Sequence, residues 1–403
     1  MFKLALRNVF RHKVRTALTL AAIMSGVAGL ILSGGFVEDS LHQLREATIH
    51  SQLGHLQIYR TGYYVFGSQA PYKYMINAPQ HAIDQVRGLA EVDDVMARLN
   101  FSAVLRNGKA DIPIQGTGIQ PEEEAKLGTR ITIIDGRRLA GGNPYEIILG
   151  EGVAKASKLR PGERASLLTS TRDGALNELD FDVVGVFRSF SKDYDARAVR
   201  IPLAGAQELL DVKGVNAIVV SLKRTEATNA VLLELRKMLD SREYEIKTWN
   251  QLADFYDKTV ALYRRQFLVL QLIILMAVIL SVANAVNMTI FERSGEFGTL
   301  MAMGNRANVI LRLAIMENAL LGLLGSGAGV VLGILLAWAI SIVGIPMPPP
   351  PNSNSGYTAL IQIVPWVVVS AFLVGFFATV VAAVLPARRA VRMPIVDALR
   401  QNQ

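Results

Sequence analysis

The side chains that most often carry chemistry do not form a catalytic or metal-binding pattern in this sequence. The 403 residues include five histidines and no cysteine, which excludes thiol catalysis, disulfides and cysteine-based metal sites. No HExxH or GxSxG segment occurs. His50 and His55 lie five positions apart, which is poor spacing for two ligands on a helix. We therefore expect no catalytic residue, no metal site and no enzymatic activity of the chain by itself.

The sequence also lacks the phosphate-binding loop of ATPases, G-x-x-x-x-G-K-[S/T]. Its only Gly-Lys pair, Gly108-Lys109, precedes Ala110 and falls in an expected hairpin turn. Glu317 is the one candidate for an ionisable residue inside an apolar span, and it lies at the expected cytoplasmic start of that span. Neither ATP hydrolysis nor ion-driven transport is predicted, and the chain is expected to bind no cofactor itself.

Long uncharged stretches of the sequence are expected to form the helices that hold any functional site in place. Apolar residues make up 51% of the chain, and prolines at 346–351 divide the longest uncharged stretch into two. A bilayer core needs about 20 apolar helical residues per span. We expect a membrane α-helical bundle of four transmembrane helices, with a large mixed α/β periplasmic domain inserted between helices 1 and 2. The expected order is a cytoplasmic amphipathic helix at 1–15, transmembrane helices at 16–37, 266–291, 318–343 and 365–385, a periplasmic domain with stalk helices at 38–265, a cytoplasmic loop at 292–317, a short periplasmic Pro-rich loop at 344–364 and a cytoplasmic tail at 386–403.

The charge distribution orients these segments. Twelve Lys or Arg residues and four acids lie in 1–15, 292–317 and 386–403, which accounts for the whole net charge of +8. Residues 38–265 carry 30 bases and 30 acids. Basic residues next to span ends stay in the cytoplasm, so both termini are expected inside. Because every basic cluster adjoins a span, nucleic-acid binding is not predicted. The first apolar stretch is longer than a usual signal-peptide core, and we expect it to remain as an anchor.

The outer segment alternates between short strand patterns and helical patterns. Strands are expected at His55–Tyr59, Ile112–Thr117, Ile131–Ile134, Ile147–Leu149, Ala165–Leu168, Phe181–Phe187, Ala198–Pro202 and Ala217–Leu222. Helices are expected at Ala78–Arg87, Leu203–Leu210 and Glu226–Asp240. Helical patterns also continue past Val37 and cover Trp249–Arg265, which predicts two stalk helices that carry the domain.

Small residues recur every four positions in two spans. Gly325, Gly329 and Gly333 form one such series, and Ser25, Gly29 and Ser33 form another. In a membrane this register lets helix backbones approach closely, whereas in a soluble helix each glycine costs about 1 kcal/mol. The pattern predicts tight helix packing at both series.

Three motifs resemble the FtsX-like ABC permeases, the superfamily that includes macrolide-exporter (MacB) and lipoprotein-releasing (Lol) permeases. Phe291–Gly304 resembles the signature R-x-x-E-[IF]-G-x-x-[RM]-A-[LM]-G, and Leu385–Arg400 is similar to the closing P-A-x-x-A-x-x-x-x-P-x-x-A-L-R. Leu4–Thr16 resembles the opening L-A-x-R-N-x-x-R-x-K-x-R-T. The outer segment Phe181–Pro202 is similar to the periplasmic domain of the family. The motifs occur in the expected order along the whole chain.

The resemblance implies a permease that works by mechanotransmission in the bacterial inner membrane. A dimer of separate ABC ATPase subunits, which would hold ATP and Mg, is implied as a partner, together with a second permease that is identical or related. The inner loop would be the coupling helix that docks into the ATPase. The implied coupling residues are Arg293, Glu296, Phe297, Gly298, Leu300, Met301, Met303 and Gly304.

Three functions remain open at this point. Gly54–Tyr59 resembles lipoprotein-releasing permeases, which implies a lipid, lipoprotein or other amphiphile as cargo. A cavity between the first two spans is then expected, lined by Val27, Leu30, Ile31, Leu270 and Ile274. Thr169–Asp180, where chaperone-docking members carry a loop rich in Pro and Met, is polar and contains neither. The alternatives are an efflux permease with a periplasmic adaptor and outer-membrane channel, and a signal transducer that controls a periplasmic partner such as a cell-wall hydrolase.

Overall fold

The computed structural model describes residues 13–67, 69–127, 131–292, 299, 303–304, 306–349, 353–354 and 356–391. These residues form two compact units. The first, here called the helix bundle, contains residues 1–42, 259–347 and 358–403. The second, here called the outer domain, contains residues 43–258 and 348–357. The described part of the amphipathic segment at 1–15 begins only at Lys13, and the tail beyond Val391 lies outside the described residues.

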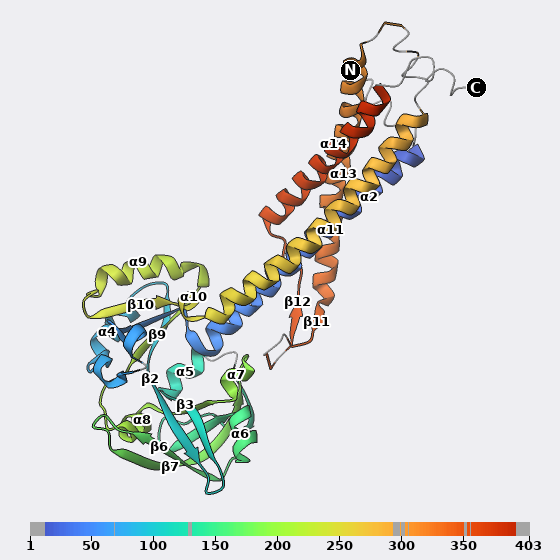
Figure 1. Cartoon of the computed structure of the whole chain (residues 1–403). Helices are drawn as coiled ribbons and strands as arrows, with labels where there is room; N and C mark the ends of the chain where they lie inside the picture. Colours follow the sequence, from blue (N-terminus) through green and yellow to red (C-terminus); the bar gives the residue numbers. More distant parts are fainter. Residues whose placement is uncertain are drawn as a thin grey trace. The chain divides into compact units, whose positions relative to one another are not determined.

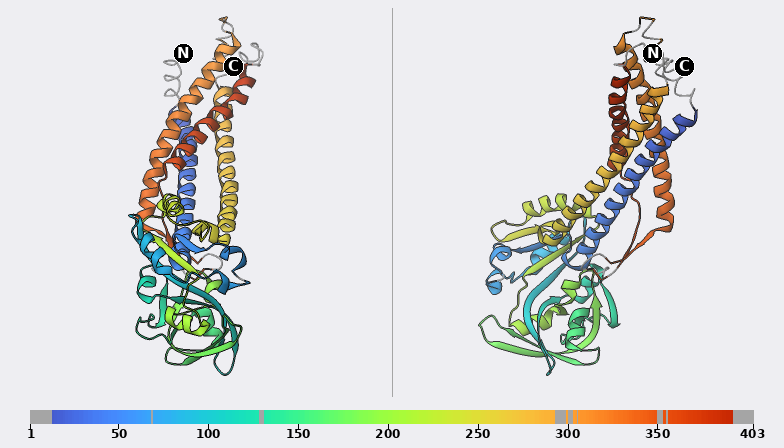
Figure 2. Two further views of the ribbon diagram at one scale, coloured as in Figure 1. Left: turned by 90° about the vertical axis from the view of Figure 1, so that its left-hand side faces the viewer. Right: turned by 45° about the vertical axis from the view of Figure 1, so that its right-hand side comes forward.

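Four long helices make the helix bundle. They are α2 (Lys13–Thr48), α11 (Asp254–Glu292), α13 (Ala307–Val343) and α14 (Pro365–Val391). Each is long and apolar enough to cross a membrane. Successive helices run in opposite directions (Figures 1 and 2). The predicted fold class, four membrane helices with a mixed α/β domain between the first two, is confirmed.

Glycines set the closest contacts within the bundle. A Cβ atom placed on Gly325, Gly329 or Gly333 of α13 would lie 3.0, 2.8 or 3.0 Å from a side chain of α2. The glycine series of α13 therefore packs directly against α2. The series in α2 behaves differently, since a Cβ on Gly29 would meet nothing within 4 Å. Gly26 instead packs against Val278 of α11, and the prediction of tight packing at Gly29 is not tested within this chain.

The connection from α13 to α14 is held to α2. It contains the short strands β11 (Ile345–Met347) and β12 (Tyr357–Ala359), which pair with each other. Asp39 of α2 is buried, and its carboxylate accepts hydrogen bonds from the backbone N–H of Leu360 (2.9 Å) and from Gln362 Nε2 (3.3 Å). The Gln362 N–H also donates to the Gly35 carbonyl. A charged residue is thus placed at the outer part of α2 to satisfy backbone groups of the connection.

One half of the outer domain is a four-stranded antiparallel sheet. Its order is β10 (Tyr244–Thr248), β1 (Leu56–Arg60), β9 (Ala217–Leu222) and the first part of β2 (Val92–Arg106). The helices α4 (Pro79–Arg87) and α9 (Thr228–Met238) follow β1 and β9 and bury Ile83, Val86 and Leu235 in the core on the sheet. The chain order βαβ–βαβ with this strand order is the ferredoxin-like arrangement. Figure 1 shows α9 beside β10 and α4 beside β9.

The other half is a closed six-stranded barrel inserted between β2 and β9. The second part of β2 pairs with β3 (Asp111–Ile119), and the ring continues through β8 (Ala198–Pro202), β5 (Glu146–Gly150), β7 (Leu176–Arg188) and β6 (Arg164–Ser170) back to β2. The strand β4 (Thr132–Gly136) extends it beside β7. Inward side chains such as Leu105, Leu167 and Phe181 fill the barrel.

Short helices complete the outer domain. They are α5 (Pro121–Leu127), α6 (Glu151–Ser157), α7 (Lys192–Asp195), α8 (Leu203–Leu210) and α10 (Trp249–Leu252), with the single turns α3 (Tyr63–Phe66), η2 (Pro71–Tyr74) and η3 (Thr225–Ala227) and the π-helical turn η1 (Ile49–Leu53). The expected turn at Gly108 closes the β2–β3 hairpin, where this residue has a φ of 76° that favours glycine.

The sequence patterns missed two strands of this domain, β2 and β10, which carry acidic and basic residues within their runs. The predicted helical stretch Trp249–Arg265 is helical except at Ala253, where φ and ψ are −102° and 59°. The helix α10 therefore ends before α11 begins.

Candidate functional site

The two stalks are the last turns of α2 and the first turns of α11, and both connect to paired strands of the outer domain. The chain leaves α2 through η1 and passes directly into β1, while β10 leads into α10 and α11. Because β1 and β10 are antiparallel neighbours, Leu56 at the start of β1 lies opposite Thr248 at the end of β10. The Trp249 N–H also donates to the His55 carbonyl over 3.0 Å. Paired strands lie about 4.8 Å apart, so the hydrogen bonds between β1 and β10 hold the two stalk ends next to each other. We call this region the stalk junction.

Gly54 makes the tight turn between η1 and β1. It has a φ of 67°, and its N–H donates to the Ile49 carbonyl. A Cβ on this residue would lie 2.4 Å from Val219 Cγ1 and 3.2 Å from the Val220 carbonyl oxygen. Both the conformation and the close approach of β9 therefore require glycine here.

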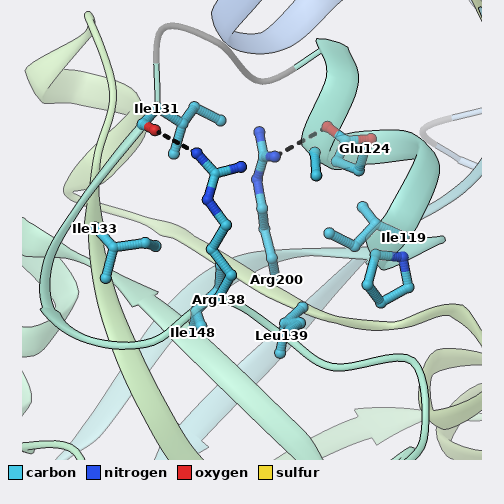
Figure 3. A pocket seen from close by; sticks show the side chains of 10 residues that line it. Ile119, Glu124, Ile131, Ile133, Arg138, Leu139, Ile148 and Arg200 are labelled. Carbon is cyan, nitrogen blue, oxygen red and sulfur yellow. Dashed lines mark hydrogen bonds and ion pairs between the residues drawn. The ribbon is translucent and has the colours of Figure 1, made fainter.

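A buried trio of charges holds the end of the first stalk. Arg98 of β2 and Arg200 of β8 both bind Glu124 of α5, with Arg98 Nε 2.9 Å from Oε2 and Arg200 Nη1 2.9 Å from Oε1. Figure 3 shows the pair formed by Arg200 and Glu124. The same arginines donate to the last carbonyls of η1, Arg98 to Gln52 and Arg200 to Ser51. The final carbonyls of a helix have no partner within the helix, and cations stabilise that end. The trio therefore caps the stalk and joins it to both halves of the outer domain.

The three charged side chains are almost fully enclosed. Glu124, Arg98 and Arg200 are 4%, 6% and 3% exposed. Burial alone would raise the pKa of Glu124, but the two guanidinium groups hold it below its ordinary value. Tyr194 accepts hydrogen bonds from Arg200 at 3.3 Å, and the guanidinium lies 5.5 Å from the centre of the Phe187 ring. Glu124 is thus ionised at neutral pH, and the trio carries one net positive charge.

A cavity of about 40 Å³ adjoins the trio. Figure 3 shows its wall, formed by apolar side chains with Arg138 donating to the Ile131 carbonyl over 3.3 Å. This volume suits one or two water molecules rather than a ligand.

A second polar network surrounds His55, which is 1% exposed. Its Nδ1 accepts from the Leu222 N–H over 3.0 Å, so the ring proton of the neutral form is on Nε2 and faces Thr225 Oγ1 at 3.1 Å. The Thr225 hydroxyl donates to the carboxylate of Glu46 near the end of α2. His50 lies edge-on to His55, with ring centres 5.4 Å apart. The network links the last turns of the first stalk to β9 and η3.

Burial, together with a smaller effect of nearby His50, lowers the pKa of His55 to about 4. A histidine whose folded pKa lies below the unfolded value of 6.5 stabilises the fold above pH 6.5. This stabilisation is lost as the pH falls from 6.5 towards about 4.

We predict that the free energy of unfolding of the outer domain declines between pH 7 and pH 5, and that His55→Asn, which keeps an acceptor for the Leu222 N–H, flattens this decline. Urea unfolding at each pH measures it. The exposed His81→Asn is the control, and equal slopes for wild type and His55→Asn would disprove the assignment.

The predicted coupling residues are only partly described. Met303 and Gly304 lie in a turn, with the Met303 N–H donating to the Thr299 carbonyl over 3.0 Å. Met303 is 68% exposed, and Gly304 has a φ of 92° that favours glycine. The other members of the set lie outside the described residues: Arg293, Glu296, Phe297, Gly298, Leu300 and Met301.

Four of the five residues proposed to line a cargo cavity pack together in the helix bundle. Val27, Leu30 and Ile31 of α2 are buried among the helices, and Val27 and Ile31 face the glycines of α13. Ile274 of α11 packs against the same cluster, whereas Leu270 is 41% exposed. Sequence reasoning missed the trio at the stalk junction. Only Arg200 gave a signal, as a charged residue in the otherwise apolar strand Ala198–Pro202.

Two family models match this chain. The MacB-like periplasmic core domain matches residues 16–238, and the FtsX-like permease C-terminal model matches residues 268–395. The chain belongs to the MacB/FtsX-like family of ABC transporter permeases. The suspected resemblance is confirmed, and the chain is a multi-pass membrane permease subunit.

Relatives of this permease fall into several functional groups. An ABC transporter permease of Methanocaldococcus jannaschii is 24% identical over 98% of this chain and 96% of its own length. The lipoprotein-releasing system transmembrane protein LolC of Neisseria meningitidis is 24% identical over 84% of this chain and 80% of its own length. The macrolide export ATP-binding/permease protein MacB of Shewanella sp. (strain ANA-3) is 24% identical over 99% of this chain, which spans 60% of that protein.

Proposed function

We propose that this permease transmits movement from separate ATPase subunits to its outer domain through the two stalks. The observation that carries the proposal is the stalk junction. The helices α2 and α11 run without interruption for 36 and 39 residues from the expected inner end to the outer domain. They lead into strands that pair with each other, and buried arginines hold the end of the first stalk. A displacement of either helix must then move the outer domain, because packed interiors deform little.

The ATPases would dock at the inner loop, and they, rather than this chain, would bind ATP and Mg. The charge distribution supports an inner-membrane location with this loop and both termini in the cytoplasm. Met303, exposed beside the φ-positive Gly304, offers an apolar anchor for an ATPase groove. Among the four spans α11 is the least covered within this chain, which leaves a face for a second permease, identical or related.

The cargo we propose is a lipoprotein or another amphiphile in the outer leaflet of the membrane. LolC, whose name states lipoprotein release, matches this chain over 80% of its own length. MacB, whose name states macrolide export, includes an ATP-binding part that this chain does not span. Efflux with a periplasmic adaptor is the second candidate. MacB matches 99% of this chain, and Thr169–Asp180 forms a β6–β7 hairpin without the Pro and Met residues of chaperone-docking loops.

One experiment separates these functions. The permease, co-expressed with its ATPase partner, is transferred to lipid nanodiscs without ATP, and copurifying molecules are identified by mass spectrometry. A lipid-modified protein that leaves on addition of ATP supports release. A stable complex with a periplasmic adaptor and no lipoprotein would favour efflux, and a stable complex with a cell-wall hydrolase would favour signalling.

Coupling is tested separately at the inner loop. We predict that Met303→Asp lowers the ATPase activity of the reconstituted complex at least tenfold, because a charge in place of the apolar anchor weakens docking by more than about 1.4 kcal/mol. The control is Arg306→Ala, an exposed position at the start of α13. Met288 is also exposed, but it lies on α11, which is expected to cross the membrane, so Met288→Asp is not a suitable control. Unchanged ATPase activity in Met303→Asp would contradict docking at this turn.

A further inference from the structure

The outer domain includes one segment that is separated in sequence from all its other residues. Residues 348–357 lie between α13 and α14 in the chain, yet they belong to the outer domain, whereas both helices belong to the helix bundle. The chain therefore attaches the outer domain to the bundle through this α13–α14 connection as well as through the two stalks. Transmission of movement through the stalks leaves this third attachment without a role.

Ser353 and Asn354 hold the connection to the outer domain, and we call their contact the connection anchor. Ser353 is buried and forms an isolated antiparallel bridge with Ser191. The Asn354 N–H donates to the Phe190 carbonyl over 3.0 Å, and Asn354 Nδ2 donates to the Ser189 carbonyl over 3.3 Å. Both the backbone and the side chain of the connection thus bind the short segment between β7 and α7.

Asp195, the last residue of α7, fixes the Asn354 side chain. This carboxylate is buried, and its Oδ2 accepts hydrogen bonds from the Ser189 N–H over 2.8 Å and from Asn354 Nδ2. Burial raises the pKa of Asp195, and the bonds from Ser189 and Asn354 counteract that rise. A buried carboxylate needs such donors, so loss of the Asn354 amide leaves the carboxylate poorly compensated. The connection anchor therefore depends on this amide.

The helix α7 is joined to the barrel and to the end of the first stalk. A Cβ on Gly152 of α6 would lie 2.5 Å from Ala196 Cα, so the backbones of α6 and of the chain just after α7 are in direct contact. Tyr194 of α7 accepts a hydrogen bond from Arg200 over 3.3 Å, and Arg200 donates to the Ser51 carbonyl at the end of η1. The first stalk and the α13–α14 connection are thus held by the same short element of the barrel.

We propose that Asn354 is a positioning residue for the movement of the outer domain, because it fastens the α13–α14 connection to α7. This inference rests on the proposed function. A domain that is held only at the stalk junction can turn about that junction, whereas a second attachment at α7 restricts the rotation. The stalks then supply the movement, and the connection anchor sets its direction. The anchor stays closed throughout the cycle, since its bridge and its carboxylate are buried.

A distance measurement on the full-length permease with its ATPase in nanodiscs tests the anchor. Spin labels are attached through p-acetylphenylalanine at Lys109, on the β2–β3 turn, and at Val343, at the end of α13. We expect Asn354→Ala to broaden the distance distribution and to reduce its ATP-dependent shift at least twofold, while ATP hydrolysis continues. The exposed Asn229→Ala on α9 is the matched control and should leave the shift unchanged.

A disulfide across the bridge separates loss of the anchor from a general loss of structure. The chain has no cysteine, and partners in an antiparallel bridge have Cα atoms about 4.5–5.5 Å apart, which suits a disulfide. In the Asn354→Ala variant, Ser191→Cys/Ser353→Cys should therefore restore the shift after oxidation. Reduction of the disulfide should return the variant to the smaller shift.

Three results would overturn the anchor. They are an equal ATP-dependent shift in Asn354→Ala and wild type, an equal loss in Asn229→Ala, and two cysteines that fail to cross-link or that cross-link without restoring the shift. Each of these leaves the proposed function standing, because the wild-type domain still moves with ATP. A wild-type permease without any ATP-dependent shift would instead refute the proposed function, and the role of the anchor with it.

Discussion

The variant Glu124→Gln should lose about 3–5 kcal/mol of the unfolding free energy of the outer domain. Glutamine preserves the shape of Glu124 but removes the charge that Arg98 and Arg200 share. Both guanidinium groups then remain buried without a counter-ion, and breaking a buried ion pair from one side typically costs this amount. The stalk carbonyls of Ser51 and Gln52 also lose the positioning of their donors. This substitution should have the largest effect of any single change in the outer domain.

Trp249 provides the readout for this prediction. It is the only tryptophan of the outer domain, and it packs edge-on against Tyr256 beside the stalk junction. In a Trp338→Phe/Trp366→Phe background, its fluorescence follows urea unfolding of this domain alone. Glu122→Gln, on the exposed face of the same helix, is the matched control and should change the midpoint little. Similar midpoints for the Glu124 and Glu122 variants would refute a structural role for the trio.

The second large effect is expected in the helix bundle. Gly329→Leu should prevent α13 from packing on α2, because even a Cβ at this position would lie 2.8 Å from Val27 Cβ and 3.1 Å from the backbone of Met24. A backbone atom cannot move aside as a flexible side chain can, so the two helices must separate. Overpacking of this kind costs about 1–3 kcal/mol or more, and tight glycine contacts are a principal source of helix association in membranes.

Gly327→Leu is a stringent control for this prediction. It lies two residues earlier on the same helix, and a Cβ there meets nothing within 4 Å. Thermal unfolding of both variants in nanodiscs, followed by size-exclusion chromatography, gives the comparison. We expect the Gly327 variant to resemble wild type and the Gly329 variant to be recovered mainly as aggregate. Equal recovery would mean that the close approach of α2 and α13 is dispensable.

Much of this architecture follows from local patterns. Uninterrupted apolar runs predict the spans because a bilayer excludes unsatisfied backbone, so few alternatives to a helix exist. Strands such as Ala217–Leu222 were predicted with their observed bounds, since β-branched residues fill both faces of a buried strand. The strand β2 was missed because its run Val92–Arg106 changes surroundings along its length, from sheet to barrel, and places Asp94 and Arg98 in buried positions. The alternation of buried and exposed residues therefore changes along the strand, and a search for one regular alternation does not find it.

Local sequence patterns could not predict the candidate site. Arg98, Glu124 and Arg200 come from three elements separated by up to 102 positions, and only the closed barrel brings them to the end of η1. Glu124 follows two other glutamates in a helix start that reads as an ordinary exposed face. The glycine series of α13 was predicted as a tight contact, but the sequence could not identify α2 as its partner, because small residues indicate close approach without naming the neighbour.

We propose that the stalk junction carries nucleotide-driven movement to the outer domain, and a distance measurement tests this directly. The chain contains no cysteine, so two can be introduced for spin labels, at Lys109 on the β2–β3 turn and at Val343 at the end of α13. Their distance distribution is measured in nanodiscs with the ATPase, before and after ATP binding. A four-residue Gly-Ser insertion after Leu53, between η1 and β1, should abolish the ATP-dependent change while ATP hydrolysis continues. An unchanged response to ATP in the insertion variant would contradict transmission of movement through the stalk junction.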